Sequence, residues 1–133
     1  MRADSARYMA RLGVTIANMD APVANLSGGQ RQAVAISRAL RLNAGLIVMD
    51  EPTAALGVKE TAQVLDLISR LKADGKTIIL VSHNMADVVA VASRVAIFKS
   101  GRKVIDRATA GLDADALAHM VMTGRDSLPR PMA

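Results

Sequence analysis

The stretch that decides the fold is residues 46–53, which read LIVMDEPT. Its first four residues are an unbroken apolar run, which predicts a short strand buried on both faces of a parallel sheet. Pro52 prevents the strand from continuing, because proline has no amide hydrogen to donate. Two adjacent carboxylates, Asp50 and Glu51, therefore stand where the predicted strand ends.

A second strand is predicted downstream, over residues 77–81 (TIILV). Residues 58–73 between the strands predict a helix, which Gly75 closes. Its apolar stripe consists of Val64, Leu65, Ile68 and Leu71. A strand, a crossover helix and a second strand predict two parallel strands. If the two strands are neighbours, His83 emerges beside Asp50 and Glu51.

The segments outside this unit predict further helices and one hairpin. Upstream, residues 4–12 predict a helix that ends at Gly13, and residues 27–43 predict an amphipathic helix. The apolar face of the second helix carries Ala33, Ile36, Ala39 and Leu40. Downstream, the sequence predicts a helix carrying Met85, Val88, Val89 and Ala92, a hairpin of 94–99 with 102–106, and a helix over 113–122. The order of elements predicts an α/β fold.

Composition excludes several classes of protein. The chain has 133 residues, of which 51% are hydrophobic, so one domain of ordinary size can form a core. It contains no cysteine, which excludes disulfides and cysteine-ligated zinc. One Phe, one Tyr and no Trp disfavour base stacking, and the net charge of +5 is spread along the chain, so no nucleic-acid partner is predicted. Without a long apolar run or signal peptide, we expect a soluble, unexported chain.

Residues 26–30, Leu-Ser-Gly-Gly-Gln, open the helix predicted from Ser27 and allow two interpretations. Serine is a favoured N-cap, so the segment can be an ordinary helix start. It can also be an anion site, because amides and the positive dipole end at a helix N-terminus favour phosphate. Gly28 and Gly29 would let a phosphate approach the backbone closely.

The polar residues at the two strand ends allow two interpretations as well. Asp50 and Glu51 can be solvated acids in a turn, or one can support a magnesium ion while the other deprotonates a water. His83 can be a structural hydrogen-bonding residue or a catalytic one. Ligands of open parallel sheets bind at this edge, which favours the catalytic interpretation.

Together the three segments resemble the ATP-binding cassette (ABC) family of ATPases. Residues 26–32 look like the ABC signature motif, residues 46–53 like the Walker B motif, and residues 81–83 like the switch-histidine loop. The order and spacing match over residues 1–124. Within the family, residues 51–60, 82–85 and 122–125 look most like the ATPases of monosaccharide importers.

The resemblance implies a role for each site residue. The signature residues Ser27, Gly28, Gly29 and Gln30 would contact the γ-phosphate of ATP held by a partner cassette. Asp50 would support Mg²⁺ through water, and Glu51 would polarise the attacking water. His83 would contact the γ-phosphate. The implied cofactors are therefore ATP and Mg²⁺.

The resemblance also implies how the chain is divided into domains and which partners it binds. Residues 1–43 would be part of the helical subdomain, residues 44–124 the C-terminal part of the ATPase core, and residues 125–133 a flexible tail. The chain would pair with a second cassette on transmembrane permease subunits that a periplasmic sugar-binding protein supplies. It would lie peripherally at the cytoplasmic face of the inner membrane and couple ATP hydrolysis to sugar uptake.

The sequence departs from the family pattern in two places. Residues 54–57 read AALG where many relatives have Ser-Ala-Leu-Asp, so an acid that helps to link the two active sites is replaced by Gly57. No Gly-x-x-x-x-Gly-Lys phosphate loop occurs in the chain. We expect that loop upstream of residue 1 and expect residues 1–133 alone to be inactive. A soluble ABC ATPase of DNA repair or translation and a non-enzymatic remnant are the alternatives.

Overall fold

The computed structural model describes residues 6–7, 9–10, 15–41, 44–54 and 56–126. It shows the predicted α/β fold, in two compact units that divide between Val81 and Ser82. The elements of the first unit are η1 (Val23–Asn25), α2 (Gly28–Arg41), β1 (Leu46–Asp50), α3 (Val58–Ala73) and β2 (Thr77–Val81). Those of the second are α4 (Met85–Val91), β3 (Arg94–Lys99), β4 (Arg102–Ala108) and α5 (Ala114–Thr123).

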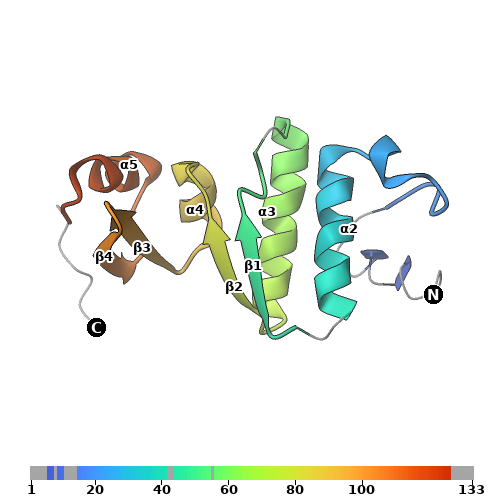
Figure 1. Ribbon diagram of the computed structural model, residues 1–133, viewed down its shortest axis with the longest axis horizontal. Coiled ribbons are helices and arrows are strands. Elements are labelled where there is room, and N and C mark those ends of the chain that lie inside the picture. Colours follow the sequence, from blue (N-terminus) through green and yellow to red (C-terminus); the bar gives the residue numbers. More distant parts are fainter. Residues whose placement is uncertain (1–5, 8, 11–14, 42–43, 55, 127–133) are drawn as a thin grey trace. The chain divides into compact units, whose positions relative to one another are not determined.

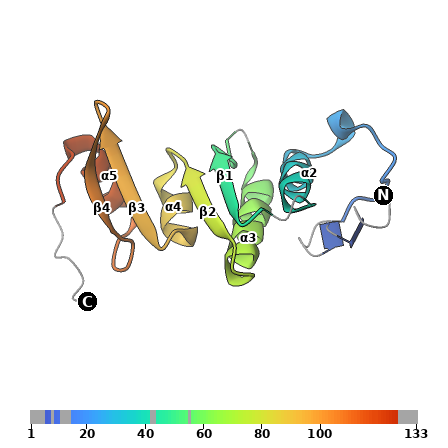
Figure 2. The same cartoon turned by 60° about the horizontal axis from the view of Figure 1, so that its bottom comes forward.

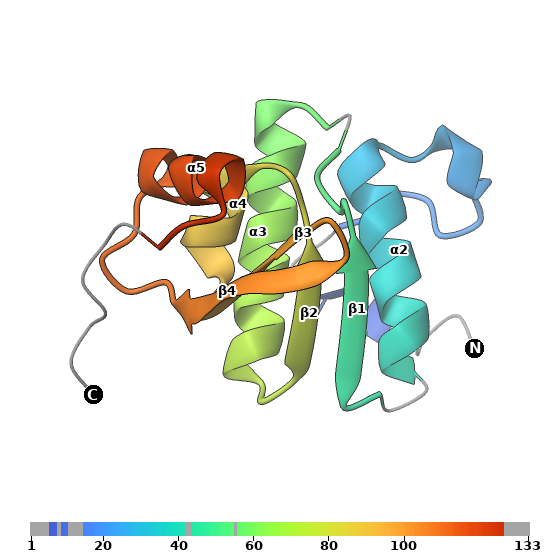
Figure 3. The ribbon, with the colours of Figure 1, turned by 60° about the vertical axis from the view of Figure 1, so that its left-hand side comes forward.

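Strands β1 and β2 pair in parallel, as predicted, and lie side by side (Figure 3). Their register places Val48 opposite Ile79 and Asp50 opposite Val81. Helix α3 connects them and ends at the turn around Gly75, whose φ of +79° is one that glycine adopts without strain. The strand, helix and strand predicted from residues 46–81 are therefore confirmed.

The expectation that both strands are buried on both faces is wrong for this structure. In β1 burial alternates, so Ile47 and Met49 are buried while Val48 remains 63% exposed. Ile79 of β2 is 49% exposed. The reason is that α3 covers only one face, and no other described element of this unit covers the opposite face (Figure 1).

Helices α2 and α3 pack side by side and form the core of the first unit with β1 (Figure 1). From α2, the predicted apolar positions Ala33 and Ile36 are buried. From α3, Leu67 is 1% exposed, whereas Leu65 of the predicted stripe is only partly buried. The stripe is thus rotated by part of a turn. The buried apolar residues of this unit are Met9, Ala33, Ile36, Ile47, Met49, Val64, Leu67, Ile68 and Leu71.

The second unit is the β3–β4 hairpin with α4 and α5, and Figure 2 shows α5 beside the hairpin. Ser100 and Gly101 form the turn with φ values of 50° and 76°, and β4 extends two residues beyond the predicted end, to Ala108. Asn84 caps α4 by accepting two backbone amides, and Asp113 caps α5 by accepting one. Its buried apolar residues are Val88, Val91, Ile97, Ile105, Leu112, Leu117 and Met120.

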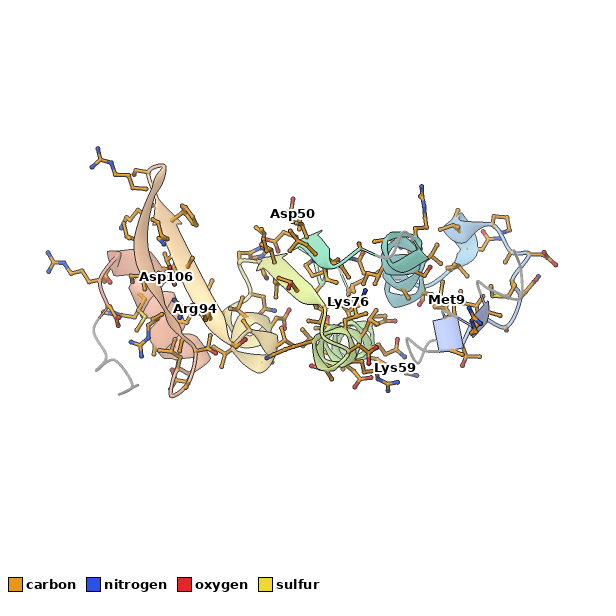
Figure 4. All side chains as sticks on the ribbon, turned by 90° about the horizontal axis from the view of Figure 1, so that it is seen from below. Met9, Asp50, Lys59, Lys76, Arg94 and Asp106 are labelled. Carbon is orange, nitrogen blue, oxygen red and sulfur yellow. The ribbon has the colours of Figure 1, made fainter. Side chains whose placement is uncertain are left out.

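Ion pairs stabilise the hairpin internally and connect it to the segment that follows α5. Asp106 accepts from Arg94 at 2.6 Å and from Lys103 at 2.8 Å on the exposed side of the hairpin (Figure 4). The hydrogen bond from Lys103, followed by that from Arg94, lowers the pKa of Asp106 below its ordinary value. Arg107 is buried and donates to Asp126 at 2.6 Å. The pair of Arg107 with Asp126 connects the segment after α5 to β4.

Some predicted segments lie partly outside the described residues. The described residues 6–7 and 9–10 are helical, but the predicted end of that helix at Gly13 is not described. Most of the predicted tail, residues 127–133, is likewise outside the described part. The division of the chain into a helical subdomain and an ATPase core at residue 43 stays a prediction.

Candidate functional site

Ser27 and Gln30 cap the start of α2 through two reciprocal hydrogen bonds. The Gln30 amide donates to Oγ of Ser27 at 3.3 Å, and the Ser27 amide donates to Oε1 of Gln30 at 3.0 Å. This arrangement is a capping box, in which each side chain satisfies the other residue's backbone amide. The Ser-x-x-Gln spacing of residues 27–30 is the sequence signal of this box. The predicted helix cap is confirmed.

The capping box accounts for only some of the backbone N–H groups in the first turn of α2. The first N–H groups of any α-helix lack acceptors within the helix, and the box accounts for that of Gln30. The amides of Gly28 and Gly29 belong to the same turn, at the positive end of a helix of 14 residues. The cap and the anion-site interpretations are therefore compatible in this structure.

Further hydrogen bonds orient the segment that leads into α2. Nε2 of Gln30 donates to the carbonyl of Thr15 at 3.1 Å, and Nη1 of Arg31 donates to the carbonyl of Leu26 at 2.9 Å. The side chain of Gln30 thus makes bonds on both sides of the turn. In this structure the Gln30 side chain stabilises the turn, independently of any contact with a ligand.

Asp50 and Glu51 stand at the carboxyl end of β1, as predicted. Asp50 is the last strand residue and is exposed, on the side of β1 away from α3 (Figure 4). The Glu51 amide donates to the carbonyl of Val81 at 2.8 Å, so Glu51 directly follows the last rung of the ladder with β2. The parallel pairing therefore brings the end of β2 to the backbone of Glu51.

The backbone of Glu51 adopts an unusual conformation. Its φ is 47°, in the left-handed region that residues with a β-carbon rarely occupy. The Ala54 amide donates to the Glu51 carbonyl at 3.1 Å and closes a tight turn that contains buried Pro52 and Thr53. Such a conformation costs about 1–3 kcal/mol, and these conformations cluster at functional sites. The turn aims the Glu51 side chain differently from an extended continuation of β1.

His83 follows β2 by two residues and is exposed. Ser82 Oγ accepts the Asn84 amide at 3.0 Å, and Asn84 in turn accepts the amides of Ala86 and Asp87 at the start of α4. The condition for His83 to lie beside the carboxylates was that β1 and β2 are neighbours, and this is confirmed. His83 belongs to the second unit, so its placement against Glu51 stays a prediction.

The described residues contain no group of three or more His, Cys, Asp or Glu side chains arranged to hold a metal ion. They also contain no helix long and apolar enough to cross a bilayer.

Comparison with known proteins identifies the family. Residues 1–54 match the family model described as ABC transporter. The chain is 48% identical over 97 residues to a fructose import ATP-binding protein, FrcA, of Rhizobium meliloti, covering 72% of this chain and 37% of that protein. It is 37% identical over 126 residues to a ribose import ATP-binding protein, RbsA, of Chromobacterium violaceum, covering 95% and 25%.

A solved structure agrees with these relatives. The dimeric post-hydrolysis state of the ATP-binding cassette MJ0796, bound to ADP and phosphate, superposes with a TM-score of 0.68 at 29% identity, covering 83% of this chain and 47% of that one. The chain spans a quarter to two fifths of the two curated relatives. It thus belongs to the ABC transporter family and comprises about half of an ATP-binding cassette.

Proposed function

We propose that this chain is part of the ATP-hydrolysing subunit of an ABC importer for sugars. The observation that carries the proposal is the placement of Asp50 and Glu51 at the end of β1, with the Glu51 amide bonded to Val81 of the neighbouring strand. Ligands of open parallel sheets bind at this edge. The fructose and ribose import proteins among its relatives support sugar as the cargo.

Glu51 acts in this proposal as the general base. A carboxylate within hydrogen-bond reach of a water can take its proton as the oxygen attacks the γ-phosphate. The positive φ of Glu51 supports this role, because the structure holds the residue in a costly conformation next to the sheet edge. The turn closed by Ala54 keeps the carboxylate from following the strand direction.

Asp50 is the residue that would hold Mg²⁺ through a water. Protein Mg²⁺ sites use one or two carboxylates together with waters and substrate phosphate, so the exposed carboxylate at the end of β1 fits the ion. When bound, Mg²⁺ neutralises charge on the phosphates. His83, two residues beyond β2, would contact the γ-phosphate, as the family resemblance implies.

The capped start of α2 would bind the γ-phosphate of ATP held by a second cassette. Ser27 orders the turn through its bond with the Gln30 amide, and the Gly28 and Gly29 amides, at the positive end of the helix dipole, would donate to the anion. Two cassettes would act on transmembrane permeases, at the cytoplasmic face of the inner membrane, with a periplasmic sugar-binding protein supplying the cargo. The dimeric cassette among the solved relatives supports the pairing.

Glu51→Gln in a full-length cassette that carries this sequence tests the proposal. The amide keeps the shape but is not a base, so steady-state hydrolysis should fall about 10²- to 10⁴-fold while ATP binding stays near wild type. Asp66→Asn is the matched control, because Asp66 is an exposed acid on α3 paired with Arg70. Hydrolysis by Glu51→Gln within a few-fold of the control would exclude Glu51 as the base.

A further inference from the structure

The start of α2 packs tightly against the segment that follows Glu51. A β-carbon added to Gly28 would overlap Cδ2 of Leu56. One added to buried Gly29 would lie 3.3 Å from Oε1 of Gln63 and 3.5 Å from the β-carbon of Glu60. The first turn of α2 therefore lies against the loop before α3 and the first turns of α3.

This close approach accounts for the glycine at position 28 independently of any ligand. Gly28 and Gly29 are helical residues, so their backbone conformation is open to any residue. The space beside them is what restricts position 28, because a larger residue must displace the side chain of Leu56. The contact therefore depends on both partners: Gly28 on α2 has no side chain, and Leu56 on the loop has a branched apolar one.

Short hydrogen-bonded turns connect Leu56 to Glu51. The Glu51 carbonyl accepts from Ala54 at 3.1 Å, and the carbonyl of buried Thr53 accepts from the Leu56 amide at 3.2 Å. The Gly57 carbonyl then accepts from the Thr61 amide at 2.9 Å in the first turn of α3. Leu56 therefore belongs to the same hydrogen-bonded loop as Glu51, so a contact made by its side chain bears on the position of that loop.

We propose that Leu56 is a positioning residue that sets the start of α2 relative to Glu51. The inference rests on the proposed function, in which the start of α2 serves the nucleotide of the partner cassette and Glu51 serves its own. Leu56 would then connect the two ATP sites within one chain by steric contact. It needs no charge at the next position, which is Gly57 in this protein.

The side-chain test compares Leu56→Ala with Val58→Ala in the full-length cassette. Leu56→Ala opens the contact, so kcat should fall about 10- to 100-fold with the KM for ATP nearly unchanged, the result of misplaced reacting groups. Leu56→Met should restore most of kcat, because methionine has a similar volume. Val58 is 92% exposed, so Val58→Ala should match wild type. Rates are expressed per subunit that binds ATP, so unfolded protein does not count as lost turnover.

The glycine test uses the opposite perturbation. Gly28→Ala places a methyl group against Leu56 and should lower kcat, whereas Gly28→Ala combined with Leu56→Ala should be more active than Gly28→Ala alone, because the methyl group then has room. A merely structural role for Leu56 would lower the melting temperature and leave kcat per ATP-binding subunit unchanged.

The outcomes separate the two proposals. A wild-type cassette without hydrolysis, or one insensitive to Glu51→Gln, removes the proposed function. A cassette that is active and sensitive to Glu51→Gln, but in which Leu56→Ala behaves like Val58→Ala and the double variant shows no rescue, overturns the positioning role alone.

Discussion

Asp126→Asn should loosen the second unit by removing the charge opposite a buried arginine. The side chain of Arg107 is 4% exposed and donates to Asp126, which is 21% exposed, at 2.6 Å. Nε of Arg107 also donates to the carbonyl of Ala108, at 3.3 Å. The asparagine variant keeps the size of the side chain but leaves the guanidinium opposite a neutral amide.

The expected cost follows from the burial of the two partners. Breaking a fully buried ion pair by removing one charge costs about 3–5 kcal/mol, because the other charge stays uncompensated. Asp126 is partly reached by water, and the bond to Ala108 remains, so we expect about 2–3 kcal/mol. Since each 1.36 kcal/mol is a factor of ten, the local opening equilibrium should rise about 30- to 150-fold.

Amide hydrogen exchange of the full-length cassette measures this opening locally, in β4 and α5. The control is Asp106→Asn, which breaks an exposed pair on the same strand, where little stability is expected to be lost. Equal acceleration by the two variants would refute the reasoning, because it would show that burial of Arg107 does not decide the cost. Acceleration confined to the first unit would also contradict it.

Four further predictions follow from individual residues. Ser27→Arg should abolish hydrolysis at the nucleotide of the partner cassette and spare ATP binding to the mutated chain; loss confined to the mutated chain's own site in mixed dimers would contradict the composite site. Leu67 is 1% exposed, so Leu67→Ala should lower the free energy of unfolding, measured in urea, by about 2–5 kcal/mol. A loss under about 1 kcal/mol would mean that the core collapses around the cavity. The lowered pKa of Asp106 means that its contribution is present above the pKa of the unfolded chain and is lost as pH falls through the lower folded value. Hairpin exchange should therefore accelerate in acid, and Asp106→Asn should remove that component. Residues 1–133 alone should bind ATP no better than millimolar and show no turnover, because the sequence contains no phosphate loop; saturable binding in calorimetry would show otherwise.

Most of the fold was predictable because its signals are local. The apolar run of residues 46–49, stopped by Pro52, predicted β1, and the spacing to residues 77–81 predicted its parallel pairing with β2. The helix over residues 58–73 was predicted with its observed bounds. Strand burial was not predictable in the same way, since an unbroken apolar run does not say how many elements will cover it. Val48 and Ile79 are exposed for that reason.

In the candidate site, too, some features were predictable from the sequence and others depend on the tertiary structure. Residue types and spacing by themselves determined the candidates at the start of α2 and at the end of β1, because phosphate and magnesium chemistry requires backbone amides and carboxylates in such places. Only the tertiary structure decided the left-handed backbone of Glu51 and the contact of Gly28 with Leu56. The Gly28 contact joins segments distant in sequence, and Glu51 turns directly after its amide bonds to Val81 of the neighbouring strand. Packing between such distant segments leaves no periodic signal along the chain.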